Sequence, residues 1–93
     1  MNIKELNIRK ENEKGKIYDA DKFMIIFRNK QSVSADHVHE KPETLFLIQG
    51  EIEVTVGDET KVFNKPAKID INPNTYHKII ALTDAIFLEE KKE

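Results

Sequence analysis

Short apolar runs, none longer than a β-strand, recur along most of this 93-residue sequence. Within 52–56, Ile52, Val54 and Val56 alternate with more polar residues, as in a strand with one buried face and one face in water. Gly, Pro and Asn lie between the runs, and no stretch keeps the period of a helix. Short strands at nearly regular spacing predict an all-β barrel or sandwich. The expected strands are 22–28, 31–39, 44–48, 52–56, 61–63, 68–71, 77–81 and 85–89, with a frayed, charged tail over 89–93.

Strands of this kind can bring the three histidines of the chain to one point. Side chains at positions i and i+2 share one face of a strand, so His37 and His39 are expected to lie side by side. A turn at Pro42 can bring Glu43 back on the neighbouring strand to face the same point. Three imidazoles and one carboxylate are a suitable ligand set for a first-row transition metal. The sequence therefore predicts one metal site, with the ligands His37, His39, Glu43 and His77.

Two segments around these residues resemble the two sequence motifs of the cupin superfamily. Residues 37–50 read His-x-His-xxx-Glu-x6-Gly, which is similar to the first cupin motif without a gap or an insertion. Residues 66–81 resemble a relaxed form of the second motif. Asn74 stands at the glycine position of that motif, and Asn tolerates the left-handed backbone conformation better than most residues do. Pro66 and Ala81 stand where the motif has a glycine and an asparagine.

The resemblance covers residues 23–88 and implies both a fold and a cofactor. The implied fold is a single antiparallel β-barrel of the jelly-roll type, so that residues 1–93 form one small cupin domain of the type-2 kind. The implied cofactor is one divalent transition metal per chain, which could be Fe, Mn, Ni, Co or Zn. Single-domain cupins do not share one activity, so the resemblance does not name a reaction.

The charges and the absence of cysteine exclude several classes of protein. Without cysteine there is no disulfide, no thiolate nucleophile and no closed Cys-rich zinc site. The net charge is −2, with 15 basic and 17 acidic residues interspersed, so no basic surface for nucleic acid is expected. No apolar run is long enough to span a bilayer, and the first residues are too polar for a signal peptide. We therefore expect a cytoplasmic protein without a nucleic-acid or membrane partner.

The alternation along the ligand-bearing strands predicts a mostly apolar cavity around the metal, which is typical of a small-molecule site. Small apolar residues share the face of the first two histidines, leucines share the face of the glutamate, and an isoleucine shares the face of the last histidine. The expected lining is Val33, Ala35, Leu45, Leu47 and Ile79. Phe46, Ile48 and Ile80 point away from this cavity. They need cover from the N-terminal segment or from a second subunit, so we expect a homodimer.

Three kinds of function are compatible with this site. A three-His, one-Glu shell leaves one or two coordination positions for a ligand, where a metal can act as a Lewis acid or orient a chelating substrate. The leading function is a metalloenzyme acting on a small chelating molecule, with an oxygenase first and an isomerase or lyase second. The alternatives are a non-catalytic module that binds a small molecule or a metal, and an inert barrel with a structural metal.

Acid–base groups for such an enzyme are scarce, because every histidine is assigned to the metal. Catalytic residues are therefore not assigned from the sequence. Tyr18 and Tyr76 are better explained by packing than by catalysis. Arg28 could bind a substrate anion if its strand presents it to the cavity.

Overall fold

The computed structural model describes residues 1–91, which contain ten β-strands and no α-helix. The strands are β1 (Ile8–Asn12), β2 (Gly15–Ala20), β3 (Phe23–Arg28), β4 (Val33–His37), β5 (Glu43–Gln49), β6 (Ile52–Val56), β7 (Glu59–Phe63), β8 (Ala67–Ile71), β9 (His77–Ala81) and β10 (Ala85–Glu90). The predicted all-β class is confirmed, and each of the eight predicted strands overlaps one of β3 to β10. No helix in this part of the chain is long and apolar enough to cross a membrane.

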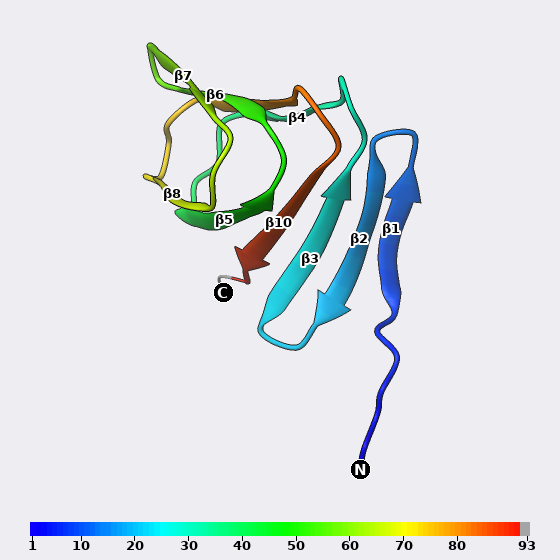
Figure 1. Ribbon diagram of the computed structural model, residues 1–93. Coiled ribbons are helices and arrows are strands. Elements are labelled where there is room, and N and C mark those ends of the chain that lie inside the picture. The colour runs from blue at the N-terminus through cyan, green and yellow to red at the C-terminus, as the bar shows by residue number, and fades with distance from the viewer. Residues whose placement is uncertain (92–93) are drawn as a thin grey trace.

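Hydrogen bonds join the strands into two antiparallel sheets. The larger sheet has the order β1-β2-β3-β10-β5-β8 and the smaller one the order β4-β9-β6-β7. β1, β2, β3 and β10 lie side by side, whereas β5 to β8 lie together on the other side of the molecule (Figure 1). The antiparallel order places the first motif, at the β4–β5 connection, beside the start of β9, because β4 pairs with β9.

One apolar core lies between the two sheets. Leu47 on β5 is 1% exposed and Ile52 on β6 is 0% exposed, although these strands belong to different sheets. The alternation seen in the sequence explains this core. Every second side chain of a strand points to the inner face of its sheet, and the inner faces of the two sheets pack against each other. Full burial of each such side chain contributes about 1.5–3 kcal/mol to stability. The core consists of Ile26, Leu45, Leu47, Ile52, Val54, Ile69, Ile71, Ile79, Ala81, Ala85 and Phe87.

A β-bulge interrupts β4 just before the first metal-motif histidine. Ser34 pairs with Ile79 and His37 pairs with His77, so two residues of β4 stand opposite one residue of β9. Ala35 has a φ of 55°, in the left-handed region. The extra residue inverts the alternation of side chains along the strand. Val33 therefore points away from the ligand face and is 38% exposed, and its predicted place in the cavity lining is wrong.

The two ends of the chain differ from the sequence-based expectation. The predicted charged tail is wrong for Glu89 and Glu90, because β10 continues to Glu90 and pairs with both β3 and β5. Residues 92 and 93 of that tail lie outside the described part of the chain. At the other end, β1 and β2 were not expected, because their many charged residues mask the strand pattern. β1 is exposed along its whole length.

Candidate metal centre

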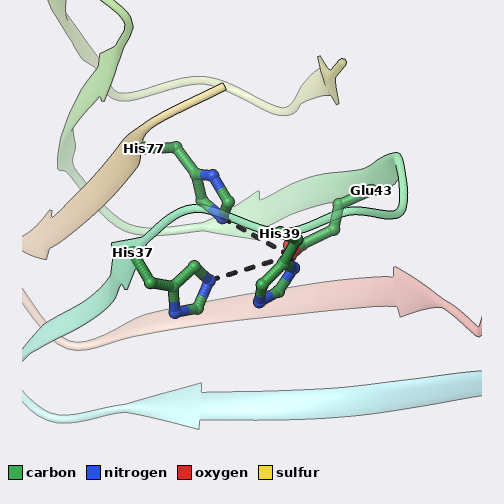
Figure 2. A group of neighbouring side chains, drawn as sticks. All are labelled: His37, His39, Glu43 and His77. Carbon is green, nitrogen blue, oxygen red and sulfur yellow. Dashed lines mark ion pairs between the residues drawn. The ribbon is translucent and has the colours of Figure 1, made fainter. Parts of the chain in front are cut away.

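The four predicted ligands come together from three strands and one loop, as Figure 2 shows. His37 ends β4, His39 follows in the loop, Glu43 begins β5 and His77 begins β9. Their ligand atoms all lie within 4.8 Å of one another. The imidazoles of His37 and His39 stack at a centroid distance of 3.9 Å, and the ring of His77 stands nearly perpendicular to both.

A backbone hydrogen bond joins the two motifs and fixes the position of His77. The N–H of Asn74 donates to the carbonyl of His39 over 2.6 Å. Asn74 has a φ of 59°, so the left-handed conformation that was expected at this position is confirmed. Gly50, which closes the first motif, is equally constrained, because a Cβ there would lie 2.5 Å from the carbonyl oxygen of Asp84. Its φ of +108° also suits glycine alone.

One carboxylate oxygen is the centre of this cluster. Oε1 of Glu43 lies 3.4 Å from Nε2 of His77 and 3.8 Å from Nε2 of His37, and it contacts Nδ1 of His39. The side chains are unequally exposed: His77 is 1% exposed and Glu43 is 12% exposed, whereas His37 and His39 are 42% and 41% exposed. The site therefore has a buried wall and a wall that faces solvent.

The hydrogen bonds around His77 identify which of its nitrogens has a free lone pair. Nδ1 lies 3.1 Å from the carbonyl oxygen of Thr75. A carbonyl only accepts, so Nδ1 carries the proton and Nε2 is left as an acceptor. Nε2 of His77 and Oε1 of Glu43 are both buried without a hydrogen-bond partner. An unsatisfied buried polar atom costs about 1–3 kcal/mol, and a metal cation would satisfy both, so the residues present fit a metal.

Electrostatics at His37 favour a neutral imidazole, which is the form that binds metals. Burial lowers the pKa of His37, and the neighbouring His39 and His77 lower it further. Glu43 acts in the opposite direction but does not outweigh these effects. At neutral pH, the lone pair of His37 is therefore available to a metal.

A cavity of about 220 Å³ is lined by three of the four proposed ligands, His37, His39 and Glu43. Of the predicted lining residues, Ala35, Leu45 and Ile79 line it, whereas Val33 and Leu47 do not. Leu47 is on the expected face of β5, but it belongs to the buried core and not to the cavity wall. The full lining comprises Ile26, Arg28, Ser34, Ala35, His37, His39, Glu43, Leu45, Ile79, Phe87 and Glu89.

Two further charged residues line the cavity: Arg28, for which the sequence left a role in binding a substrate anion open, and Glu89, which it did not assign to the site. In the register of β3 and β10, Arg28 pairs with Ala85 and Met24 pairs with Glu89, so both charges share the face of the core residue Phe87. Burial raises the pKa of Glu89 to about 7; Glu43 also raises it, and Arg28 lowers it. Burial lowers the pKa of Arg28, against the influence of Glu89. The alternation along residues 85–89 could have revealed the inward position of Glu89, since it places Glu89 on the same face of the strand as Ala85.

The two tyrosines lie outside this cavity. The hydroxyl of Tyr76 donates to the carboxylate of Asp36 over 2.6 Å, and this bond raises the pKa of the Tyr76 phenol. Tyr18 packs edge-on against Phe27, with ring centroids 5.9 Å apart. Neither ring is among the residues that line the metal cavity.

Comparisons with solved structures identify the same fold in several proteins. An RmlC-like cupin from Shewanella frigidimarina has a TM-score of 0.78 and 18% identity, over 90% of this chain and 80% of that one. The capsular polysaccharide assembling protein CapF from Staphylococcus aureus has a TM-score of 0.80 and 16% identity, over 95% of this chain. Oxalate decarboxylase from Bacillus subtilis, a protein with Mn(II) centres, has a TM-score of 0.75 and 19% identity, over 90% of this chain.

These similarities concern the fold alone, because the identities are low. This chain spans 28% of the CapF chain and 26% of the oxalate decarboxylase chain. A search of curated proteins found no match. The family model described as "Cupin domain" matches residues 23–89, which is most of the chain. Together with the all-β fold and the His-Glu cluster, this match shows that the protein belongs to the cupin family.

Proposed function

We propose that the protein holds one divalent transition metal (Fe, Mn, Ni, Co or Zn) and binds a small chelating molecule beside it. The proposed ligands are His37, His39, Glu43 and His77. The observation that carries this proposal is the pair of buried atoms, Nε2 of His77 and Oε1 of Glu43, which face each other at 3.4 Å without a hydrogen-bond partner. Two buried lone pairs in contact are unfavourable unless a cation lies between them.

The size of the cavity limits the chelating molecule. Its volume of about 220 Å³ is below the usual range of about 300–1,000 Å³ for drug-sized ligands. Liquid water occupies about 30 Å³ per molecule, so the cavity has room for about seven waters. A ligand held wholly inside is therefore a small organic molecule and not a nucleotide-linked sugar.

A metalloenzyme is the function that this arrangement supports best, with an oxygenase as its leading form. When bound, the metal supplies Lewis acidity and open coordination positions. The chain itself supplies apolar walls, such as Leu45, Ile79 and Phe87, which exclude water from those positions. Few side chains there can move a proton, and oxygen chemistry at a metal needs few of them.

Glu89 favours an isomerase or lyase as the second candidate. Its carboxylate lines the cavity, and burial raises its pKa to about 7. A general base is most effective when its pKa is near the working pH. A proton could thus pass between Glu89 and a metal-bound substrate. A ligand that binds without turnover in either assay would instead support a non-catalytic binding module.

We also propose a homodimer built on the outer face of the larger sheet. The register of β3, β10 and β5 gathers six apolar side chains there: Ile25, Phe27, Phe46, Ile48, Ile86 and Leu88. Phe27 is 40% exposed and Ile48 is 49% exposed. Such a patch on a small protein favours association. Ile80, also expected to need cover, is half-buried on the smaller sheet. We further propose that the chain forms one jelly-roll barrel domain and acts in the cytoplasm.

Metal content and thermal stability test the metal site directly. Purified protein is loaded anaerobically with Fe(II), Mn(II), Ni(II) or Zn(II), freed of excess metal and analysed for metal per chain. We expect about one ion per chain in the wild type and a large loss in Glu43→Gln. In a separate thermal melt with free ion at a hundred times its Kd, binding adds about 2.7 kcal/mol to stability, so the melting temperature of the wild type should rise by roughly 10–20 °C.

Glu40→Gln is the matched control, because Glu40 is an exposed loop residue of the same motif. It should bind metal as the wild type does. Equal metal content in Glu43→Gln and Glu40→Gln would contradict the ligand assignment, provided that both variants keep the β-rich circular dichroism spectrum.

A further inference from the structure

Arg28 brings a positive charge into the cavity of the proposed metal site. It is the last residue of β3, on the same face of that strand as the buried Ile26. Ile26 and Phe87 lie opposite each other in the β3–β10 register, and both line the cavity together with Arg28. Arg28 is the only lysine or arginine among the residues that line this cavity.

The guanidinium of Arg28 forms no ion pair and no hydrogen bond within residues 1–91. No carboxylate there lies within 4.0 Å of it, and none of the hydrogen bonds described for that part of the chain involves its side chain. The other arginine of the chain, Arg9, pairs with Asp19 at 3.0 Å. Arg28 is half-buried, so its five N–H donors are partly withdrawn from water without a full replacement. A partly buried, unpaired guanidinium in a cavity is suited to an anion from outside.

The charges around the cavity also favour an anion. The charge of Glu89 raises the pKa of Arg28, but Glu89 does not form a contact ion pair with it. A divalent ion held by a single carboxylate, Glu43, would leave a net positive charge on the metal side. Apolar walls strengthen these electrostatic interactions, because they exclude water.

We propose that Arg28 binds the distal carboxylate of a small acid whose other oxygens chelate the metal. The substrate class is then a small hydroxy or oxo acid that carries a second carboxylate. The planar guanidinium binds a carboxylate through two parallel hydrogen bonds, and the limited volume of the cavity selects short acids. This inference rests on the proposed metal site, and it adds the substrate class and the residue that selects it.

Two matched pairs of chelators test the proposal on Mn(II)-loaded protein. Malate and 2-hydroxybutanoate share the chelating hydroxy-acid end and differ in the distal group, which is a carboxylate in one and a methyl in the other. 2-Hydroxyglutarate and 2-hydroxypentanoate form a second pair with one more methylene, which covers a longer reach. Dissociation constants are measured by calorimetry, so the readout does not depend on turnover.

We expect the wild type to bind the dicarboxylate of at least one pair about tenfold or more tightly than its partner, as for a charge-assisted hydrogen bond. Arg28→Met, which keeps an apolar side chain of similar reach, should lose this preference and leave the affinity for the monocarboxylate unchanged. Arg28→Lys should keep only part of the preference for the dicarboxylate, because Lys lacks the planar guanidinium. Arg9→Met is the control for loss of one arginine outside the cavity and should behave as the wild type.

The outcomes separate this inference from the proposed function. Metal content is measured for each protein before the titrations. A wild type that takes up no metal overturns the proposed function and this inference with it. A wild type that holds metal but shows no dicarboxylate preference in either pair overturns the inference alone. A preference that survives in Arg28→Met, with metal content and melting temperature unchanged, also overturns it.

Discussion

Glu89 is a single carboxylate whose protonation is coupled to folding. Burial raises its pKa from 4.5 to about 7, and the neighbouring Glu43 adds to this shift. Between these two values the folded protein binds more protons at Glu89 than the unfolded chain does. The free energy of unfolding therefore decreases as the pH rises through this window. Below about pH 4.5 both states hold the proton and the penalty is absent.

We expect the metal-free protein to lose on the order of 1–2 kcal/mol of stability through Glu89 between about pH 5 and pH 8, after allowance for solvent screening. Glu89→Gln keeps the shape of the side chain without its titration, so its stability should be higher than that of the wild type at pH 8. Urea denaturation at several pH values measures this difference. His37 titrates in both proteins, so its contribution cancels. Parallel pH profiles for the two proteins would contradict the assignment.

Individual residues were predictable from the sequence where their chemistry allows few alternatives. The four candidate ligands were chosen from their side chains and spacing, and Asn74 was expected to adopt the left-handed conformation that it has. The place of Arg28 was left open because the register of its strand was unknown, and Glu89 was expected to begin a charged tail, since charged residues usually lie on the surface. Only the pairing of β3 with β10 places both charges on the inner face.

Strand β4 shows how one element can depart from a regular pattern. Its bulge contains Ala35 at a φ of 55°, which an alanine adopts only with strain. Alternation in the sequence could not reveal this extra residue, because nothing in an alanine signals a positive φ. The same limitation explains why Val33 was placed in the cavity and Ser34 was not. The bulge nevertheless presents His37 to the partner strand opposite His77.

We expect Ala35→Gly to stabilise the protein by about 0.5–1 kcal/mol, because glycine adopts a positive φ without the steric cost of a Cβ. Urea denaturation of the metal-free protein measures the change. Ala20→Gly is the opposite control: Ala20 lies in the regular strand β2, where glycine should destabilise by about 0.5–1 kcal/mol. If both substitutions destabilise equally, the left-handed conformation of Ala35 is not the native one.

Other elements were missed for a different reason. β1 and β2 are rich in charged residues, and β1 buries no side chain, so no apolar period marked them. They join the sheet through backbone pairing at its edge, where β1 pairs with β2 and β2 pairs with β3. The end of β10 was mistaken for a tail because of its charges. Six of the eight predicted strands, β3, β5, β6, β8, β9 and β10, were predictable because each contributes apolar residues to the core.

The whole molecule is elongated, with extents of 47 × 29 × 24 Å, and its larger sheet has an apolar outer face. We expect the protein to sediment as a dimer through this face. Phe27→Lys should shift it to the monomer, because a charge within the patch cannot be buried without a partner. Analytical ultracentrifugation over a range of concentrations measures the shift.

Val62→Lys is the control for an added charge, since Val62 is 56% exposed on β7 of the smaller sheet. It should leave the dimer intact. A wild type that remains monomeric at all concentrations, or a dimer that Val62→Lys disrupts instead, would contradict an interface on the larger sheet.

The unequal burial of the four proposed ligands separates the capture of an ion from its retention. His37 and His39 are 42% and 41% exposed, whereas His77 is 1% exposed. At the proposed site, an ion that arrives from solvent would meet the outer pair first and reach the buried imidazole last. Release along the reverse path would break the bond to His77 first and the bonds to His37 and His39 last. The outer histidines would thus govern how quickly the protein acquires an ion, and the inner one how long it keeps it.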